Sequence, residues 1–151
     1  MPGPTDVFAA RILIVDDQES NLRLLEYALR RAGYVGITST ADPVAVCALH
    51  RLNRYHVILL DVKMPRMNGF EVMAALKNGN DAGEVAILIL TADPGQMVQA
   101  LEAGAAGFLT KPFILVEVVE RVRILAEKAL QAIKVDRCIV PDLMRAALAI
   151  S

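Results

Sequence analysis

The sequence predicts an α/β protein built on a doubly wound, five-stranded parallel sheet. Three observations support this prediction. Short apolar runs alternate along the chain with amphipathic stretches, the runs are almost continuously apolar, and the stretches between them are long enough for crossover helices. Continuously apolar strands are typical of parallel sheets that helices cover on both faces. At 151 residues the chain fits one such domain with a short extension.

The secondary-structure elements follow from this alternation in chain order. We expect strands at residues 11–15, 34–40, 56–61, 85–91 and 106–110. We expect helices at residues 20–33, 42–53, 69–79, 94–104 and 113–134. Ser20 is predicted to cap the first helix and Gly33 to end it, since these residue types favour those positions. Asp42 followed by Pro43 is typical of the start of the second helix.

Composition limits the range of functions. The net charge is −1, so direct nucleic-acid binding is not expected. No apolar run approaches the roughly 18 residues of a membrane helix, and the first residues lack the pattern of a secretory leader. Cys47 and Cys138 match no metal or redox spacing, which favours reduced thiols in a cytoplasmic protein. A mean hydropathy of +0.43 is high and predicts apolar surface for a partner.

Polar side chains follow four of the five predicted strands. They are Asp16 and Asp17 after the first strand, Asp61 at the end of the third, Thr91 at the end of the fourth and Lys111 after the fifth. Singly, each could be a cap, a turn residue or a solvated charge. The carboxyl ends of parallel strands meet at one edge of a sheet, which is where such folds bind ligands. We therefore expect these five side chains to form one site.

Three clustered carboxylates either raise one another's pKa or bind a cation. Hard oxygen ligands without His or Cys favour Mg²⁺, with Mn²⁺ as the alternative, over zinc or copper. A metal ion beside an aspartate, a hydroxyl and an ammonium group has the outline of a phosphoryl-transfer site. An aspartate nucleophile there would form an acyl phosphate.

Four segments together resemble the receiver domain of two-component response regulators. They read "ILIVDDQESNLRLLEYALRRAGY", "HVILLDVKMPRMNGFEVMAALK", "AILILTA" and "ALEAGAAGFLTKPF". The resemblance extends over residues 11–130 and implies a flavodoxin-like (βα)5 fold with strand order 2-1-3-4-5. The predicted divisions are then an N-terminal extension (1–10), a receiver domain (11–133) and a tail or linker with room for a short helix (134–151).

The resemblance also implies a role for each residue of the acidic site. Asp61 would be the phospho-acceptor, and Lys111 would contact the phosphoryl oxygens. Asp17 would bind the Mg²⁺ ion directly, Asp16 would bind it through water, and Asp61 with the backbone carbonyl of Lys63 would complete the protein ligands. The phosphoryl group would come from a sensor histidine kinase or a phosphotransfer protein. The domain would catalyse only its own phosphorylation and dephosphorylation, so we do not expect an enzyme.

Further positions are expected to support the switch. Thr91 and Phe108 occupy the positions of the hydroxyl and the aromatic ring that move together on activation, which would alter contacts with a downstream protein or output domain. The Lys111–Pro112 peptide bond is expected to be cis by resemblance. In "MPRMNG", Pro65 restricts the backbone after the acceptor and Gly69 allows close approach.

Two other functions compete with this interpretation. A phosphotransferase of the haloacid dehalogenase class also uses an aspartate with Mg²⁺, but it needs a second Asp two residues later, where Lys63 stands. A degenerate receiver that binds proteins without phosphorylation usually lacks part of the site, and here every member is present. The sequence therefore favours a phosphorylation switch, in a chain that either acts alone or forms the front part of a longer regulator.

The last predicted helix has more apolar residues than one sheet-facing side requires. Ile114, Val116 and Ile124 are expected to lie off that face. With the apolar tail after residue 134, they predict a homodimer paired through the last helix or the tail.

Overall fold

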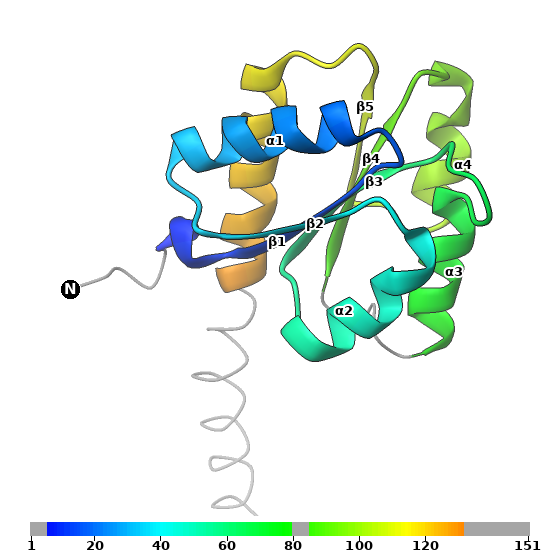
Figure 1. Ribbon diagram of the computed structural model, residues 1–151, viewed down its shortest axis with the longest axis horizontal. Coiled ribbons are helices and arrows are strands. Elements are labelled where there is room, and N and C mark those ends of the chain that lie inside the picture. Colours follow the sequence, from blue (N-terminus) through cyan, green and yellow to red (C-terminus); the bar gives the residue numbers. More distant parts are fainter. Residues whose placement is uncertain (1–5, 80–84, 132–151) are drawn as a thin grey trace, which may run out of the picture.

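The computed structural model describes residues 6–79 and 85–131 and has the predicted α/β architecture. Five strands form one sheet in the order β2-β1-β3-β4-β5, and every neighbouring pair is parallel (Figure 1). The strands are β1 (Arg11–Val15), β2 (Gly36–Thr40), β3 (Val57–Asp61), β4 (Ala86–Thr91) and β5 (Gly107–Thr110). The strand order 2-1-3-4-5 is therefore confirmed.

Helices connect the strands. They are α1 (Glu19–Ala32), α2 (Val46–Asn53), α3 (Gly69–Asn78), α4 (Met97–Glu102) and a last helix described over residues 115–131. Short 3₁₀ turns are η1 (Val7–Ala9), η2 (Pro43–Ala45) and η3 (Pro94–Gln96). Residues 132–134, which complete the last helix predicted from sequence, lie outside the described residues. None of the described helices combines the length and hydrophobicity needed to cross a membrane.

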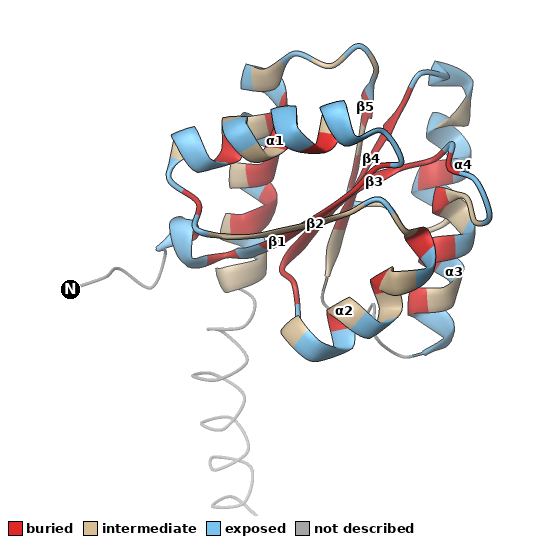
Figure 2. Ribbon diagram, in the orientation of Figure 1, coloured by how far each residue is buried: buried red, intermediate tan, exposed pale blue. Residues whose placement is uncertain are grey.

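The sheet separates two hydrophobic layers, and its central strands are buried on both faces (Figure 2). α1 and the last helix pack on one face, where Leu25 and Val122 belong to the same hydrophobic cluster as Leu59 of β3. α2, α3 and α4 pack on the other face, to which α3 contributes Val72 and α4 contributes Ala100. Burial on both sides explains why β3 reads as an unbroken apolar run, since neither face of that strand meets water.

The first helix begins one residue earlier than predicted, and Ser20 is not its cap. Gln18 is the N-cap residue, with an extended backbone. The Asp16 carboxylate accepts a hydrogen bond from the Gln18 amide at 2.9 Å, which turns the chain into the helix before Ser20 is reached. Gly33 ends the helix as predicted, with a φ of 118° that favours glycine.

The other boundaries differ from prediction by small amounts. The second helix begins as the 3₁₀ turn η2, and the Asp42 side chain caps this turn by accepting from the Val44 amide at 3.0 Å. The fourth helix likewise begins as the turn η3, so its α-helical part is short.

Part of the predicted N-terminal extension packs on the domain. Val7 and Ala10 are buried, and the Phe8 ring meets Tyr34 edge-on with ring centroids 5.4 Å apart. Gly33 lies beneath the same ring, since a Cβ atom there would approach Phe8 to 2.9 Å. η1 therefore covers the end of α1 with apolar side chains.

Candidate functional site: an acidic pocket at the carboxyl ends of the strands

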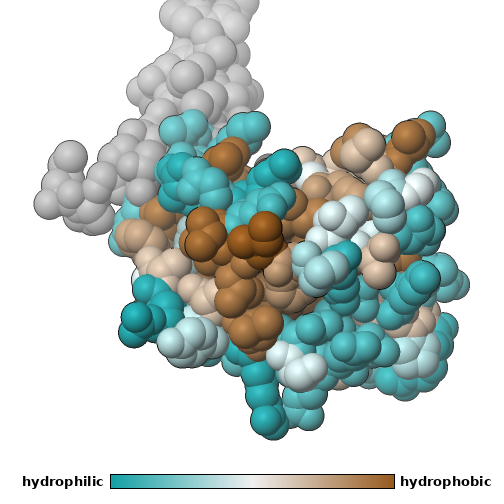
Figure 3. Space-filling view, turned by 90° about the horizontal axis from the view of Figure 1, so that it is seen from above, coloured by the Kyte–Doolittle hydropathy of each residue, from teal (hydrophilic) through white to brown (hydrophobic). Residues whose placement is uncertain are grey.

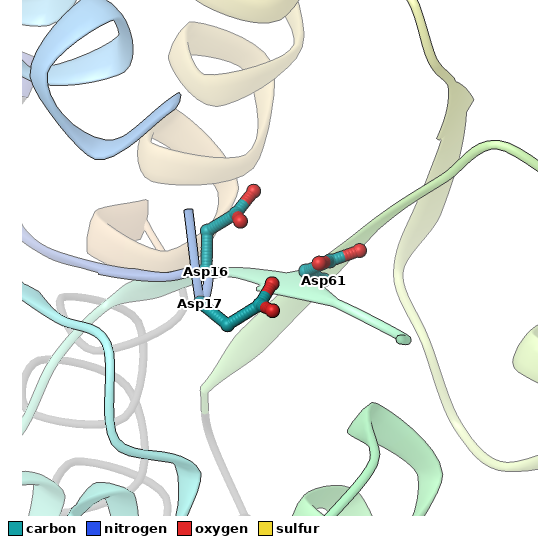
Figure 4. Close-up of side chains that lie close together, drawn as sticks. All are labelled: Asp16, Asp17 and Asp61. Atoms are coloured by element: carbon teal, nitrogen blue, oxygen red, sulfur yellow. The ribbon is translucent and has the colours of Figure 1, made fainter. Parts of the chain in front are cut away.

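Three carboxylates meet where β1 and β3 end. Asp61 is the last residue of β3, while Asp16 and Asp17 directly follow β1, its neighbour in the sheet. One oxygen atom from each side chain lies within 4.8 Å of the others (Figure 4). The sequence prediction that these residues share a site is thus confirmed in geometry, because parallel pairing brings the two strand ends to the same edge.

Asp16 is held in place by protein donors. It is 1% exposed, and its Oδ1 atom accepts from the Gln18 amide. Its Oδ2 atom accepts from Asn21 Nδ2 at 3.2 Å and from Lys111 Nζ at 2.9 Å. Asp17 is exposed and lines the groove outside the site. The Asp16 carboxylate is thus occupied by protein donors, whereas the Asp17 carboxylate is open to solvent.

Lys111 directly follows the edge strand β5, and its ammonium group lies between the Asp16 and Asp61 carboxylates. Its Nζ atom lies 2.9 Å from Asp16 Oδ2 and 3.3 Å from Asp61 Oδ1, and its side chain is 18% exposed. Its amide donates to the Thr91 carbonyl at 2.7 Å, which anchors the segment after β5 to the end of β4. Burial lowers the pKa of Lys111, but the hydrogen bond to Asp16 and the charges of both aspartates outweigh burial and raise the pKa above its ordinary value. The ammonium group therefore stays charged at neutral pH.

Asp61 has an unusual proton affinity. Burial, followed by the charge of Asp16, raises the pKa of Asp61 to about 6, against an opposing effect of Lys111. A carboxylate that is hard to ionise in isolation gains most from a nearby cation. The site is thus short of positive charge, and one lysine only partly supplies it.

The loop after Asp61 closely approaches the end of β3. The Gly69 amide donates to the Val62 carbonyl at 2.9 Å, and a Cβ atom at Gly69 would lie only 2.6 Å from the Asp61 carbonyl oxygen. Asn68 and Glu71 form a reciprocal capping box that begins α3 at this point. The predicted need for glycine at position 69 is confirmed.

Pro65 and Lys63 lie in the same loop and line the groove with Asp17. The Pro65 carbonyl accepts from the Met67 amide at 2.8 Å, and Arg66 between them has a φ of 70°. The chain therefore turns sharply just beyond β3, as the sequence predicted.

Thr91 and Phe108 lie on the same side of the sheet, the side covered by α4. Thr91 is fully buried, and its hydroxyl donates to Gln96 Oε1 at 2.8 Å. Phe108 is half-buried and packs against the hydrophobic layer that contains Ala100 of α4. The Lys111–Pro112 peptide bond is cis, as expected.

Sequence reasoning missed three polar residues of the site. Gln18 and Asn21 hold Asp16, and Gln96 accepts the Thr91 hydroxyl. Each lies within five residues of its partner, yet glutamine and asparagine are ordinary near helix starts. Nothing in the linear pattern distinguishes them from solvated residues.

The donor set fits a divalent metal ion. Mg²⁺ binds oxygen atoms at about 2.0–2.1 Å, so opposite ligand atoms lie about 4 Å apart. Adjacent ligand atoms lie about 3 Å apart in the same octahedron. Three carboxylate oxygens within 4.8 Å of one another are therefore close enough for one ion to lie among them. Carboxylates also suit Mg²⁺ or Mn²⁺ better than softer metals.

A doubly wound sheet of order 2-1-3-4-5, with an acidic pocket and a lysine at its switch point, places the chain in the class of flavodoxin-like α/β domains. Residues 12–123 match the response regulator receiver domain family, and the chain belongs to that family. It is therefore a receiver domain of the two-component type.

Individual relatives agree with this assignment. The chain is 41% identical over 117 residues to the response regulator PleD of Caulobacter vibrioides, covering 76% of this chain and 26% of PleD. Among solved structures, the chemotaxis protein CheY4 of Vibrio cholerae has a TM-score of 0.71 at 31% identity, with 78% of this chain and 98% of that chain covered.

A third relative bears on the metal. The receiver domain of the sensor histidine kinase PA1611 from Pseudomonas aeruginosa has a TM-score of 0.71 at 28% identity, with 78% of this chain and 98% of that chain covered. That structure has a magnesium ion coordinated in its active-site cleft.

Proposed function

We propose that Asp61 accepts a phosphoryl group from the phosphohistidine of a sensor kinase or a phosphotransfer protein, in a Mg²⁺-dependent reaction. An Asp61 oxygen attacks phosphorus, a P–O bond forms, the P–N bond breaks, and the imidazole leaves. The observation that carries this proposal is the meeting of three carboxylates within 4.8 Å with Lys111 across two of them. A phosphorylation-independent binding module would not need that arrangement.

Asp16, Asp17, Asp61 and the Lys63 carbonyl would hold the metal ion. The ion would neutralise charge on the phosphoryl oxygens as they approach. Lys111 does the same from the protein side, because its ammonium group already contacts Asp61 and is close enough to follow a phosphoryl group bound there. The magnesium-bound PA1611 receiver supports this choice of ion.

The acyl phosphate would act as a switch. A phosphoryl group adds about −1.5 to −2 charge and three acceptor oxygens. In the proposed switch, Thr91 donates to one of these oxygens, its loop moves inward, and Phe108 fills the vacated space. The surface formed by α4, β5 and the last helix changes as a result, which alters binding to a downstream protein or output domain.

The domain would act on no substrate other than itself, so its enzymatic activity is limited to its own phosphorylation and dephosphorylation. The chain covers only 26% of PleD, and the partner and output are accordingly part of the proposal. A cytoplasmic location belongs to it too, because the two thiols would stay reduced there.

Self-association is proposed for apolar side chains of the last helix and of Ile114, the residue directly before it. Ile114 is 65% exposed, Val116 78% and Ile124 37%, so these three side chains lie off the packed face as predicted. Apolar side chains gather on the face of the molecule seen from above in Figure 3. A second copy of the chain could cover such surface around a two-fold axis. The tail, the other predicted contact, lies outside the described residues.

The proposal is tested by treating the wild-type protein and the Asp61→Asn variant with acetyl phosphate. Wild-type protein with Mg²⁺ should gain one phosphoryl group at Asp61 by mass spectrometry, and Asp61→Asn should gain none at that position. A chelator should abolish labelling of the wild type. Labelling of Asp61→Asn at the wild-type level would contradict the assignment, and no labelling of either protein would favour the phosphorylation-independent module.

A further inference from the structure

The turn after β4 is closed by hydrogen bonds among its own residues. The Thr91 hydroxyl donates to Gln96 Oε1 at 2.8 Å and accepts from the Asp93 amide at 3.3 Å. The Asp93 carbonyl accepts from the Gln96 amide at 3.1 Å, and its carboxylate accepts from the Gly95 amide at 2.9 Å. The hydroxyl of Thr91 is thus part of a ring that includes Gln96.

A threonine hydroxyl has one proton to donate. While Thr91 donates to Gln96, it cannot also donate to a group on Asp61. Thr91 is 0% exposed, so its hydroxyl does not exchange this partner for bulk water. Any acceptor that recruits the hydroxyl must first replace the Gln96 carbonyl oxygen.

We infer that Gln96 is a positioning residue that holds Thr91 in the unphosphorylated arrangement and so opposes activation. The inference rests on the proposed function, in which Thr91 must turn to a phosphoryl oxygen. The competition is between two single hydrogen bonds from one donor, so removal of the Gln96 acceptor should shift the balance by the contribution of one hydrogen bond.

The position of Gln96 couples this exchange to the neighbouring helix. Gln96 is the N-cap residue of α4, and its side chain lines the groove that also contains Asp17 and Lys63. Release of the side chain frees the Thr91 hydroxyl at the residue where α4 begins. Gln96 is therefore placed to link the acidic pocket to the α4 surface.

The affinity for fluoroberyllate, a phosphoryl analogue, tests the inference in the full chain with Mg²⁺. Gln96→Met keeps the length of the side chain but removes the acceptor. It should bind the analogue about 2- to 10-fold more tightly than wild type, as expected for the loss of one competing hydrogen bond. The matched control is Gln99→Met, which changes an exposed glutamine of α4 in the same groove and should leave the affinity unchanged.

A double-mutant cycle separates this role from a structural one. Thr91→Val removes the hydroxyl while keeping the shape, so Gln96→Met should have no effect on analogue affinity in that background. An unchanged or weaker affinity of Gln96→Met, or the same gain with Val at position 91, would overturn the inference while the proposed function stands. A wild-type protein that binds no fluoroberyllate would overturn both. Thermal unfolding of each variant shows that it is folded.

Discussion

Gly69 lies against the backbone of Asp61, the proposed phospho-acceptor. A Cβ atom at position 69 would be 2.6 Å from the Asp61 carbonyl oxygen and 3.0 Å from the Val62 Cα atom. Both contacts are to backbone at the end of β3, which no side-chain rotation can relieve. The position of Asp61 therefore depends on the absence of a side chain eight residues later.

Gly69→Ala is expected to destabilise the protein by about 1–3 kcal/mol, the range for overpacking a tight site. It should also slow labelling by acetyl phosphate, because the shift needed to admit the methyl group moves the acceptor. Urea unfolding and the labelling rate measure the two effects. Gly36→Ala is the control: its nearest contact would be 3.4 Å, and its stability should change by about 0.5 kcal/mol or less. Equal effects of the two substitutions would contradict the prediction.

The raised pKa of Asp61 predicts how stability depends on pH. The folded state binds this proton more tightly than the unfolded chain does, since the pKa is about 6 in the fold against an ordinary 3.8. Tighter binding of this proton stabilises the folded state fully below about pH 4, and this stabilisation is lost as the pH rises through 6. In metal-free buffer, Asp61→Asn should therefore be more stable than wild type at pH 7.5, by about 1–3 kcal/mol, and the gain should vanish near pH 4.

His56 changes stability in the opposite direction. Burial, with help from Arg11, lowers the pKa of His56, whose Nδ1 atom accepts from the Arg11 amide at 2.9 Å. The fold favours the neutral form of His56, which stabilises the folded state above pH 6.5, and this stabilisation is lost as the pH falls. Both proteins contain His56, so its contribution cancels when the free energy of unfolding of wild type is subtracted from that of Asp61→Asn at each pH. A difference that does not vary with pH would show that the Asp61 charge is not its cause.

Lys111 is predicted to stabilise the pocket only when the carboxylates are charged. Lys111→Met leaves Asp16 and Asp61 without their ammonium partner, and loss of one member of a buried ion pair costs about 3–5 kcal/mol. The loss in urea unfolding should be large at pH 7.5 and smaller at pH 4.5, where Asp61 binds a proton. Added Mg²⁺ should restore part of the stability at pH 7.5. Losses of equal size at both pH values would point to lost packing instead.

Self-association through the last helix predicts a specific effect of charge. Ile114→Glu should shift a dimer toward monomer in sedimentation at tens of micromolar protein, since an exposed isoleucine contributes about 1.5–3 kcal/mol when buried. Leu52→Glu on α2 is the control, because Leu52 is 80% exposed far from that helix in sequence. A chain ending at residue 134 separates the helix from the tail. A wild-type monomer with and without fluoroberyllate would exclude self-association and leave the surface to another partner.

Much of the fold and the acidic pocket was predictable from the sequence. Continuously apolar runs such as residues 57–60 are recognisable without long-range information, because a strand buried on both faces needs apolar residues at every position. Asp16, Asp17 and Asp61 could be placed together for a related reason: strands that run in parallel end at one edge of the sheet. These features are determined by local periodicity and by topology.

Only the tertiary structure decided which side chains form hydrogen bonds and ion pairs with one another. Lys111 and Asp16 are 95 residues apart, and their contact depends on how β5 and β1 are placed in the sheet. The first helix begins before Ser20 because the Asp16 carboxylate accepts a hydrogen bond from the Gln18 amide. The Thr91 hydroxyl donates to the Gln96 side chain, a pairing that the linear pattern does not indicate. A sequence specifies which groups can donate and accept. Which pairs form is decided in three dimensions, because a hydrogen bond requires its two atoms within about 3 Å.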